Sequence, residues 1–262
     1  MTNTSVVSSV SRLGKYEPFH LQVSRGQVTM HTPIHIWGYS SLIDGVLLPI
    51  WDVNQAKPYI TTAAVMKISS GSANDTAAGT GARTVLVSGL DAAYTPISET
   101  VTLNGQTAVN TTNSYLRVSS IRVLTAGSGG ANAGVLYAGT GDITTGVPAV
   151  VHEIVPIGMN LSQTTAYTVP AGHTAYFVRG GMTSKTEGSG AITARLTASN
   201  QGSPFVTSAV TVFSNTQVDY EFEYPIAFPE KTDVEARAIS SSGTHAVSAY
   251  LQLILIKDNG QT

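Results

Sequence analysis

The stretch ISETVTLNGQTAVNTTNSYLRV, residues 97–118, indicates the fold class. Apolar and polar residues alternate through its first part, and this period of two places successive side chains on opposite faces of a β-strand. Asn104 and Gly105 follow, the pair preferred at the centre of a type I′ turn because both positions need positive φ. The stretch therefore predicts a β-hairpin. One face of its first strand carries the polar Glu99 among the apolar residues Ile97, Val101 and Leu103.

Strand signals recur along most of the chain, whereas helical periodicity is nearly absent. Short alternating segments stand between turn residues at spacings of roughly 8–12 residues, the rhythm of a sandwich or barrel. Besides the hairpin, the segments expected to form strands are 83–88, 116–127, 133–141, 191–199, 205–213, 220–228, 232–240 and 249–257. The last of them, AYLQLILIK, is apolar on both faces, which predicts a strand that is central in its sheet or buried in a subunit contact.

Five carboxylates fall between residues 221 and 235, and paired carboxylates hydrolyse glycosides. The enzyme hypothesis rests on Glu221 and Glu223. Alternation instead favours a solvated, salt-bridged strand face beside Lys231. In 232–240 the residues expected to point inward are Val234, Ala236 and Ala238, and those expected to point outward are Asp233, Glu235 and Arg237.

The composition fits short strands joined by many turns. Charged residues make up 11% of the 262 residues, against about 25% in an average domain. A net charge of −2 indicates no nucleic-acid partner and no anionic membrane partner. Because the chain has no cysteine, disulfides, thiolate metal sites and cysteine nucleophiles are excluded. No secretory signal is expected, and no apolar run approaches the roughly 20 residues of a membrane helix.

None of the six histidines predicts a metal site. His31 and His35 have a ligand spacing for a helix, but Pro33 between them favours an extended segment. In a strand, residues four apart lie roughly 13 Å from each other, too far to share a metal. The remaining candidates, which the pattern places in strands and turns without a partner, are His152 beside Glu153, His173 and His245.

Other site signals are equally weak. Asp75 and Asp142 lie in loops with one carboxylate each, whereas Ca²⁺ takes several, so each Asp is expected to stabilise its own turn. No Gly-x-Ser-x-Gly elbow and no phosphate-binding loop is present. The sequence therefore predicts no catalytic residue, no metal site and no cofactor.

Four stretches carry a resemblance to a known family. They are SRLGKYEPFHLQVSRGQVTMHTPIHIWGYS (11–40), the segment from SANDTAAGTGARTVLVSGLD to SYLRV (72–118), YTVPAGHTAYFVRGGMTS (167–184) and YPIAFPEKTDVEARAIS (224–240). Together they resemble structural proteins of tailed bacteriophages, especially those of aquatic phages. The resemblance implies a non-enzymatic virion component assembled in the bacterial host cytoplasm. It implies no position in the particle and brings no catalytic residues.

We therefore expect an all-β fold with two β-sandwich (jelly-roll-like) domains and an extended N-terminal arm. The arm is predicted at 1–36, the first sandwich at 37–146 and the second at 147–262, with a linker around Gly146 and Pro148. Unpaired strand-like pieces in the arm should pair with another domain or subunit. These pieces are Val6–Val7, Phe19–Val23 and Val28–Ile36.

The favoured function is a capsid decoration, cement or vertex protein that stabilises the particle through subunit contacts. Its expected partners are the major capsid protein or tail proteins, and a homo-oligomer, most simply a trimer, is expected. The alternative is a tail-fibre, adaptor or receptor-binding protein that recognises a host glycan or protein. Aromatic residues near loops are suited to stack on sugars, and the candidates are Trp37, Tyr39, Tyr94 and Tyr115.

Overall fold

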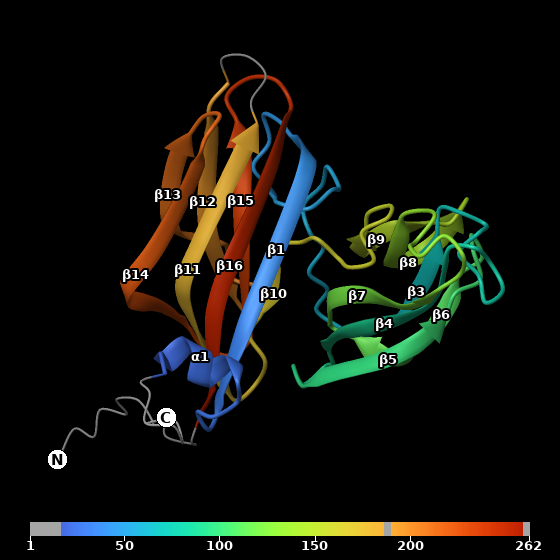
Figure 1. Ribbon diagram of the computed structural model, residues 1–262, viewed down its shortest axis with the longest axis horizontal. Coiled ribbons are helices and arrows are strands. Elements are labelled where there is room, and N and C mark those ends of the chain that lie inside the picture. The colour runs from blue at the N-terminus through green and yellow to red at the C-terminus, as the bar shows by residue number, and fades with distance from the viewer. Residues whose placement is uncertain (1–16, 186–189, 259–262) are drawn as a thin grey trace.

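The structure, a computed structural model, describes residues 17–185 and 190–258. In this part of the chain it consists almost wholly of antiparallel β-strands, so the expected all-β class is confirmed (Figure 1). The strands form two packing units. The larger unit joins the beginning and the end of the described chain, and the smaller unit is the continuous segment between them.

The larger unit is built from two sheets that face each other. Its strands are β1 (His31–Ile43), β2 (Leu48–Pro49), β10 (Ala166–Thr168), β11 (His173–Lys185), β12 (Ile192–Asn200), β13 (Val206–Phe213), β14 (Gln217–Phe228), β15 (Thr232–Ser240) and β16 (His245–Lys257). One sheet has the order β1-β16-β11-β14, and the other has β10-β15-β12-β13 with β2 beside β15. Both sheets bury apolar side chains in one core, among them Phe177, Leu196 and Leu251.

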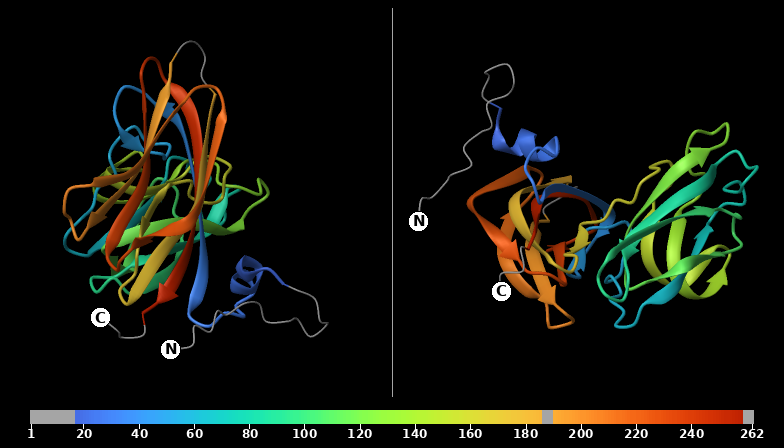
Figure 2. Two further views of the ribbon diagram at one scale, coloured as in Figure 1. Left: turned by 90° about the vertical axis from the view of Figure 1, so that its left-hand side faces the viewer. Right: turned by 90° about the horizontal axis from the view of Figure 1, so that it is seen from below.

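The smaller unit also has two sheets. Its strands are β3 (Ala64–Ser70), β4 (Ala82–Leu90), β5 (Pro96–Thr102), β6 (Val109–Tyr115), β7 (Arg117–Ala126), β8 (Leu136–Thr144) and β9 (Val147–Val155). They pair in the orders β6-β3-β8-β9 and β5-β4-β7, and enclose a second core around Met66, Val87 and Ile121. The right-hand view of Figure 2 shows this unit beside the larger one. In sequence it is an insertion between β2 and β10.

The predicted domain boundaries are wrong because pairing joins distant segments. The boundary between residues 36 and 37 falls inside β1, which pairs along its length with β16. The boundary at 146 and 147 falls in the turn between β8 and β9, which pair with each other. Thr145 and Gly146 both have positive φ, 48° and 81°, as a two-residue hairpin turn requires. The expected linker is therefore a tight hairpin.

The hairpin predicted at Asn104 and Gly105 is also wrong. The strands on either side, β5 and β6, belong to different sheets, so the chain crosses between the layers instead of turning back. Gly105 does have positive φ, 60°, whereas Asn104 does not. The predicted alternation before it is confirmed, because Val101 and Leu103 are buried and Glu99 accepts a hydrogen bond from the hydroxyl of Tyr115 at 3.1 Å.

The three strand-like pieces predicted in the arm have different outcomes. Val6–Val7 lies outside the described residues. The piece Phe19–Val23 is not a strand, because Phe19–Ser24 forms the short helix α1 beside β1. The piece from residue 31 to 36 does pair, with β16 of the same chain. Pro33 is accommodated because β1 is the edge strand of its sheet, where a missing N–H is tolerated.

The last strand confirms the prediction from its two apolar faces. β16 lies between β1 and β11, the central position expected of such a strand. Its inward residues, such as Leu251 and Leu253, are fully buried, and its outward ones, such as Ile254, are half-buried. Among the described residues, no helix combines the length and apolar character needed to cross a membrane.

Candidate functional site: the junction between the two units

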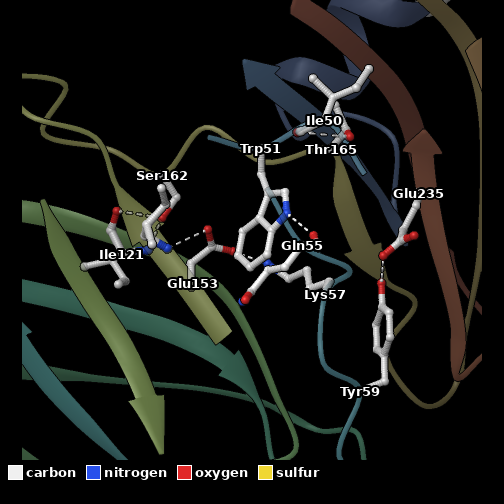
Figure 3. A network of polar contacts seen from close by, with 11 residues as sticks. Ile50, Trp51, Gln55, Lys57, Tyr59, Ile121, Glu153, Ser162, Thr165 and Glu235 are labelled. Carbon is white, nitrogen blue, oxygen red and sulfur yellow. Dashed lines mark hydrogen bonds and ion pairs between the residues drawn. The ribbon is translucent and has the colours of Figure 1, made fainter. Parts of the chain in front are cut away.

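Two linkers connect the units, and polar contacts fix both of them (Figure 3). The first linker begins with Ile50, directly after β2, and its next residue, Trp51, is fully buried against Val151 and Ile154 of β9. The indole N–H of Trp51 donates to the carbonyl of Gln55 at 2.9 Å. A buried Trp whose polar atom is satisfied anchors the linker to the smaller unit.

A buried ion pair holds the middle of this linker. Lys57 Nζ lies 2.5 Å from Glu153 Oε2, and Glu153 is fully buried. The ammonium group also lies 4.8 Å from the ring centroid of Trp51, a cation–π contact. Burial raises the pKa of the Glu153 carboxyl, and Lys57 counteracts that shift. Lys57 therefore offsets part of the cost of ionising the buried Glu153 carboxyl.

A second buried ion pair crosses from one unit to the other. Arg117, the first residue of β7, donates from Nε and Nη2 to the two carboxylate oxygens of Asp233 on β15, both at 2.9 Å. Its Nη1 donates to the carbonyl of Ile60 at 2.8 Å, and Thr168 Oγ1 donates to Asp233 at 2.6 Å. Burial acts to lower the pKa of Arg117, but the bonds to Asp233 outweigh it and the pKa is raised.

The end of the first linker covers the neighbouring carboxylate of β15. Tyr59 donates its hydroxyl to Glu235 Oε1 at 2.6 Å, and Arg237 pairs with the other oxygen at 2.5 Å. The ring of Phe205 stacks with both, 5.6 Å from the Tyr59 ring and 4.0 Å from the Arg237 guanidinium. Burial and the charge of Glu235 raise the pKa of Tyr59 well above its usual value.

The predicted orientation of this acidic strand is confirmed, and its predicted solvation is wrong. Asp233 and Glu235 do point away from the core of the larger unit, but they are 2% and 0% exposed. The reason is that the inserted unit and its linker lie against the outer face of β15. A salt-bridged surface was expected, and the salt bridges belong to an internal junction.

The second linker is pinned by backbone-directed hydroxyls. Thr165 Oγ1 donates to the carbonyl of Ala236 at 2.8 Å, and Thr165 N donates to the carbonyl of Ile50 in the first linker at 3.1 Å. Ser162 Oγ accepts from Ile121 N at 2.8 Å. Each linker is thus bonded to both units, and the two linkers are bonded to each other.

The predicted metal candidates do not come together. Among the described residues, no group of three or more His, Asp or Glu side chains is placed to hold a metal ion. His31 and His35 lie along β1 opposite Ile256 and Gln252. His152 is buried and contacts the hydroxyl of Thr140 at 3.1 Å. Burial is the main cause that lowers the pKa of His152. The other two residues, half-buried His173 and buried His245, each contact a backbone carbonyl near a turn.

Asp75 has a larger structural role than its own turn. Its buried carboxylate accepts from four donors, which are Ala82 N (2.7 Å), Ala133 N (2.8 Å), Gly134 N (2.9 Å) and Ser70 Oγ (2.6 Å). It ties the loop between β3 and β4 to the loop between β7 and β8. Asp142 is exposed on β8, and Glu221 and Glu223 are exposed on β14. The latter two lie in a different sheet from Asp233 and Glu235, so the five carboxylates form no single site.

The four aromatic candidates separate into two groups. Tyr115 is buried in the core of the smaller unit, and Tyr94 lies at the junction, where its carbonyl accepts from Ala171 N at 3.0 Å. Trp37 and Tyr39 lie on the outer face of β1, and Trp37 is 57% exposed. Of the four, Trp37 is the one with a large exposed ring, while Tyr39 and Tyr94 are half-buried.

The junction residues Lys57, Tyr59 and Arg117 were missed from the sequence. A usable signal exists for the two cations among them, because the chain has only 14 Lys and Arg residues and both Lys57 and Arg117 stand in apolar sequence surroundings. Lys57 precedes Pro58, Tyr59 and Ile60, and Arg117 stands between Leu116 and Val118. A rare cation in an apolar segment indicates a buried partner.

Comparison with known proteins gives little. No family model and no curated protein matches the chain. Among solved structures, the chain is distantly similar to one from infectious bursal disease virus of the Gt strain, with 10% identity, 94% of this chain and 79% of that chain covered, and a TM-score of 0.23. A second is from the Gx strain, with 12% identity, 88% and 73% coverage, and a TM-score of 0.23. Likeness at this level carries no argument about function.

Proposed function

We propose that the protein is a non-enzymatic structural component of a virion, and specifically a capsid decoration, cement or vertex protein of a tailed phage. The observation that carries the proposal is the strand order of the larger unit. Without β2 and the insertion, its eight strands in chain order stand as 1-8-3-6 in one sheet and 2-7-4-5 in the other. This is the order of a jelly roll, an architecture of viral capsid and lectin domains. The resemblance of four sequence stretches to tailed-phage structural proteins points the same way.

The junction supports a mechanical role. Two buried ion pairs, Lys57 with Glu153 and Arg117 with Asp233, fix the inserted unit and its linker against the larger unit. A component that transmits force between neighbours needs a rigid connection of this kind. On the smaller unit, we propose a second sandwich of the same general type, because its two sheets also enclose one core.

Subunit contacts are the proposed means of stabilising the particle. The edge strand β13 exposes Val206, Val210 and Val212 at 67%, 58% and 64%, and β14 at the other sheet's edge exposes Tyr224 at 83%. Apolar side chains on adjacent edge strands favour association with another chain. We propose a homo-oligomer, most simply a trimer, bound to the major capsid or tail proteins. No nucleic acid, membrane or cofactor enters the proposal.

Mass spectrometry and cryo-electron microscopy of purified particles test this role. The protein should be present in the particles, in hundreds of copies over the head. A few copies at the tail would instead favour the alternative, a tail-fibre, adaptor or receptor-binding protein, for which the exposed Trp37 is the supporting observation. Absence of the protein from the particles would overturn the virion role altogether.

A further inference from the structure

The outer face of the sheet β1-β16-β11-β14 carries one row of side chains that crosses all four strands. Trp37 on β1 pairs with Tyr250 on β16, Tyr250 pairs with Gly181 on β11, and Gly181 pairs with Asp219 on β14. An indole therefore stands at one end of the row and a carboxylate at the other. We call this row, together with the neighbouring Gln217, the platform.

The aromatic end of the platform presents a free ring. Trp37 is 57% exposed, although burying a side chain of this size is strongly favourable. Its ring lies 5.1 Å from that of Tyr250 at an interplanar angle of 33°. This contact orients the indole and leaves much of it in solvent. Tyr250 thus serves as a support for the exposed ring.

The polar end is preorganised by hydrogen bonds. Tyr250 donates its hydroxyl to Asp219 Oδ1 at 2.5 Å, and Gln217 donates from Nε2 to Oδ2 at 2.6 Å. These two donors are the main causes that lower the pKa of Asp219, and the charge of Arg179 adds to them. The carboxylate is therefore ionised at neutral pH, and each fixed oxygen keeps a lone pair for a further donor.

Gly181 lies between Tyr250 and Asp219 in the row. A Cβ at this position would collide with Oδ1 of Asp219 and with the ring of Tyr250. The missing side chain lets the tyrosine hydroxyl reach Asp219 across β11. Beside this contact lies a hollow of about 200 Å³ in the sheet surface, which Trp37, Gln217 and Tyr250 line and Asp219 does not. The hydroxyls of Thr183 and Ser248, 2.6 Å apart, also line this hollow. Pockets that enclose drug-sized ligands have roughly 300–1,000 Å³, so a single small ring fits here.

We propose that the platform binds a neutral saccharide. An exposed indole offers a surface for the apolar C–H face of a sugar ring, and a fixed carboxylate, an amide and two hydroxyls offer acceptors and donors for its hydroxyl groups. Asp219 and the exposed Glu221 two residues further on disfavour an anionic ligand. The proposal concerns the purified chain and does not depend on the virion role.

A cationic side chain from a protein partner is the competing ligand, because it would pair with Asp219 and stack on Trp37. The structure favours the saccharide, since Asp219 already receives two donors and has the positive charge of Arg179 nearby. One exposed ring also falls short of the several rings that form an aromatic cage for cations.

Binding of the full-length protein to an array of oligosaccharides tests the proposal. The array carries glucose, galactose, mannose and N-acetylglucosamine oligomers, with sialylated and sulfated glycans as anionic controls. We expect neutral oligomers to bind, and Trp37→Ala and Asp219→Ala each to weaken the best ligand at least tenfold in calorimetry. Trp37→Phe should retain part of the affinity. Tyr224→Ala removes an 83% exposed aromatic ring from the same sheet outside the platform and should leave binding unchanged.

Three results would overturn the proposal. The first is that no neutral glycan binds, and the second is that binding survives both Trp37→Ala and Asp219→Ala in folded protein. The third is that a lysine- or arginine-rich peptide binds instead and is lost in both variants, which would assign the platform to a cationic protein partner. Circular dichroism of each variant separates loss of binding from loss of fold. Presence in purified particles is measured separately, so either proposal can fail alone.

Discussion

Replacing Arg117 tests whether the junction holds the two units together. Arg117→Met removes two bonds to Asp233 at 2.9 Å and one to the carbonyl of Ile60, and it leaves Asp233, 2% exposed, with Thr168 as its remaining side-chain donor. Breaking a buried pair from one side costs about 3–5 kcal/mol. At about 2–4 °C per kcal/mol, the melting temperature should fall by about 6–20 °C.

Urea unfolding and calorimetry measure this loss, and two comparisons make it specific. The double variant Arg117→Met with Asp233→Leu leaves no unpaired charge, so it should recover most of the stability lost in either single variant. Arg25→Ala breaks a pair with Glu17 in which the Arg25 side chain is 56% exposed and the Glu17 side chain 10% exposed. Because one partner is open to solvent, this change should cost less than Arg117→Met. The reasoning is refuted if Arg117→Met costs no more than Arg25→Ala, or if the double variant is as unstable as the sum of the singles.

Three further changes test other parts of the structure. Lys57→Met should destabilise the protein at pH 7 and less so at pH 5, because burial has already raised the folded-state pKa of Glu153. A carboxyl with a raised folded pKa loses stability as pH rises through that pKa, and unfolding of variant and wild type at both pH values measures the difference. Gly105→Val should lower the melting temperature more than Gly130→Ala: both glycines have positive φ, but a Cβ at 105 would lie 3.2 Å from Ala73 Cα and one at 130 meets nothing within 4 Å. Deleting residues 1–36 removes half of β1 and should abolish the soluble fold, whereas a chain that begins with β1 should keep it, as circular dichroism would show.

Each of these three predictions would be contradicted by a specific result. An equal loss at pH 5 and pH 7 for Lys57→Met would mean that Glu153 does not titrate in that range. Equal melting temperatures for the two glycine variants would show that the space around residue 105 adapts. Native-like circular dichroism after deletion of residues 1–36 would mean that the pairing between β1 and β16 contributes little.

The alternation of apolar and polar residues correctly predicted which side chains of a strand are buried. The two apolar faces of 249–257 predicted a strand that is central in its sheet or buried in a subunit contact, and β16 is central. Alternation in 232–240 placed Val234, Ala236 and Ala238 inward, and all three are buried in the core. In both cases the signal is the side-chain period of a strand, which does not depend on the partner strand.

The predictions failed where contacts with a segment distant in sequence determine the structure. The sequence pattern of two strands around a turn glycine is the same whether the chain turns back or crosses to the other sheet. The pattern therefore predicted a hairpin for β5 and β6, which lie in different sheets. Alternation showed that Asp233 and Glu235 leave the core, but it carries no information about Tyr59 and Arg117, which cover them. Only part of the platform could be predicted from the sequence. Trp37 was a candidate, but its partners Tyr250 and Asp219 are more than 180 residues away in sequence.

The pairing of β1 with β16 determines the order in which the strands can fold during synthesis. Chains are made from the N-terminus, and domains generally fold as units while synthesis continues. The inserted unit is contiguous and can fold early, but β1 has to wait for β16, the last strand among the described residues. During that interval β1 offers an open edge on a polysome where neighbouring nascent chains carry the same strands. A β16 from a neighbouring chain would satisfy that edge with the same backbone bonds, so the fold has the geometry that strand exchange between copies requires.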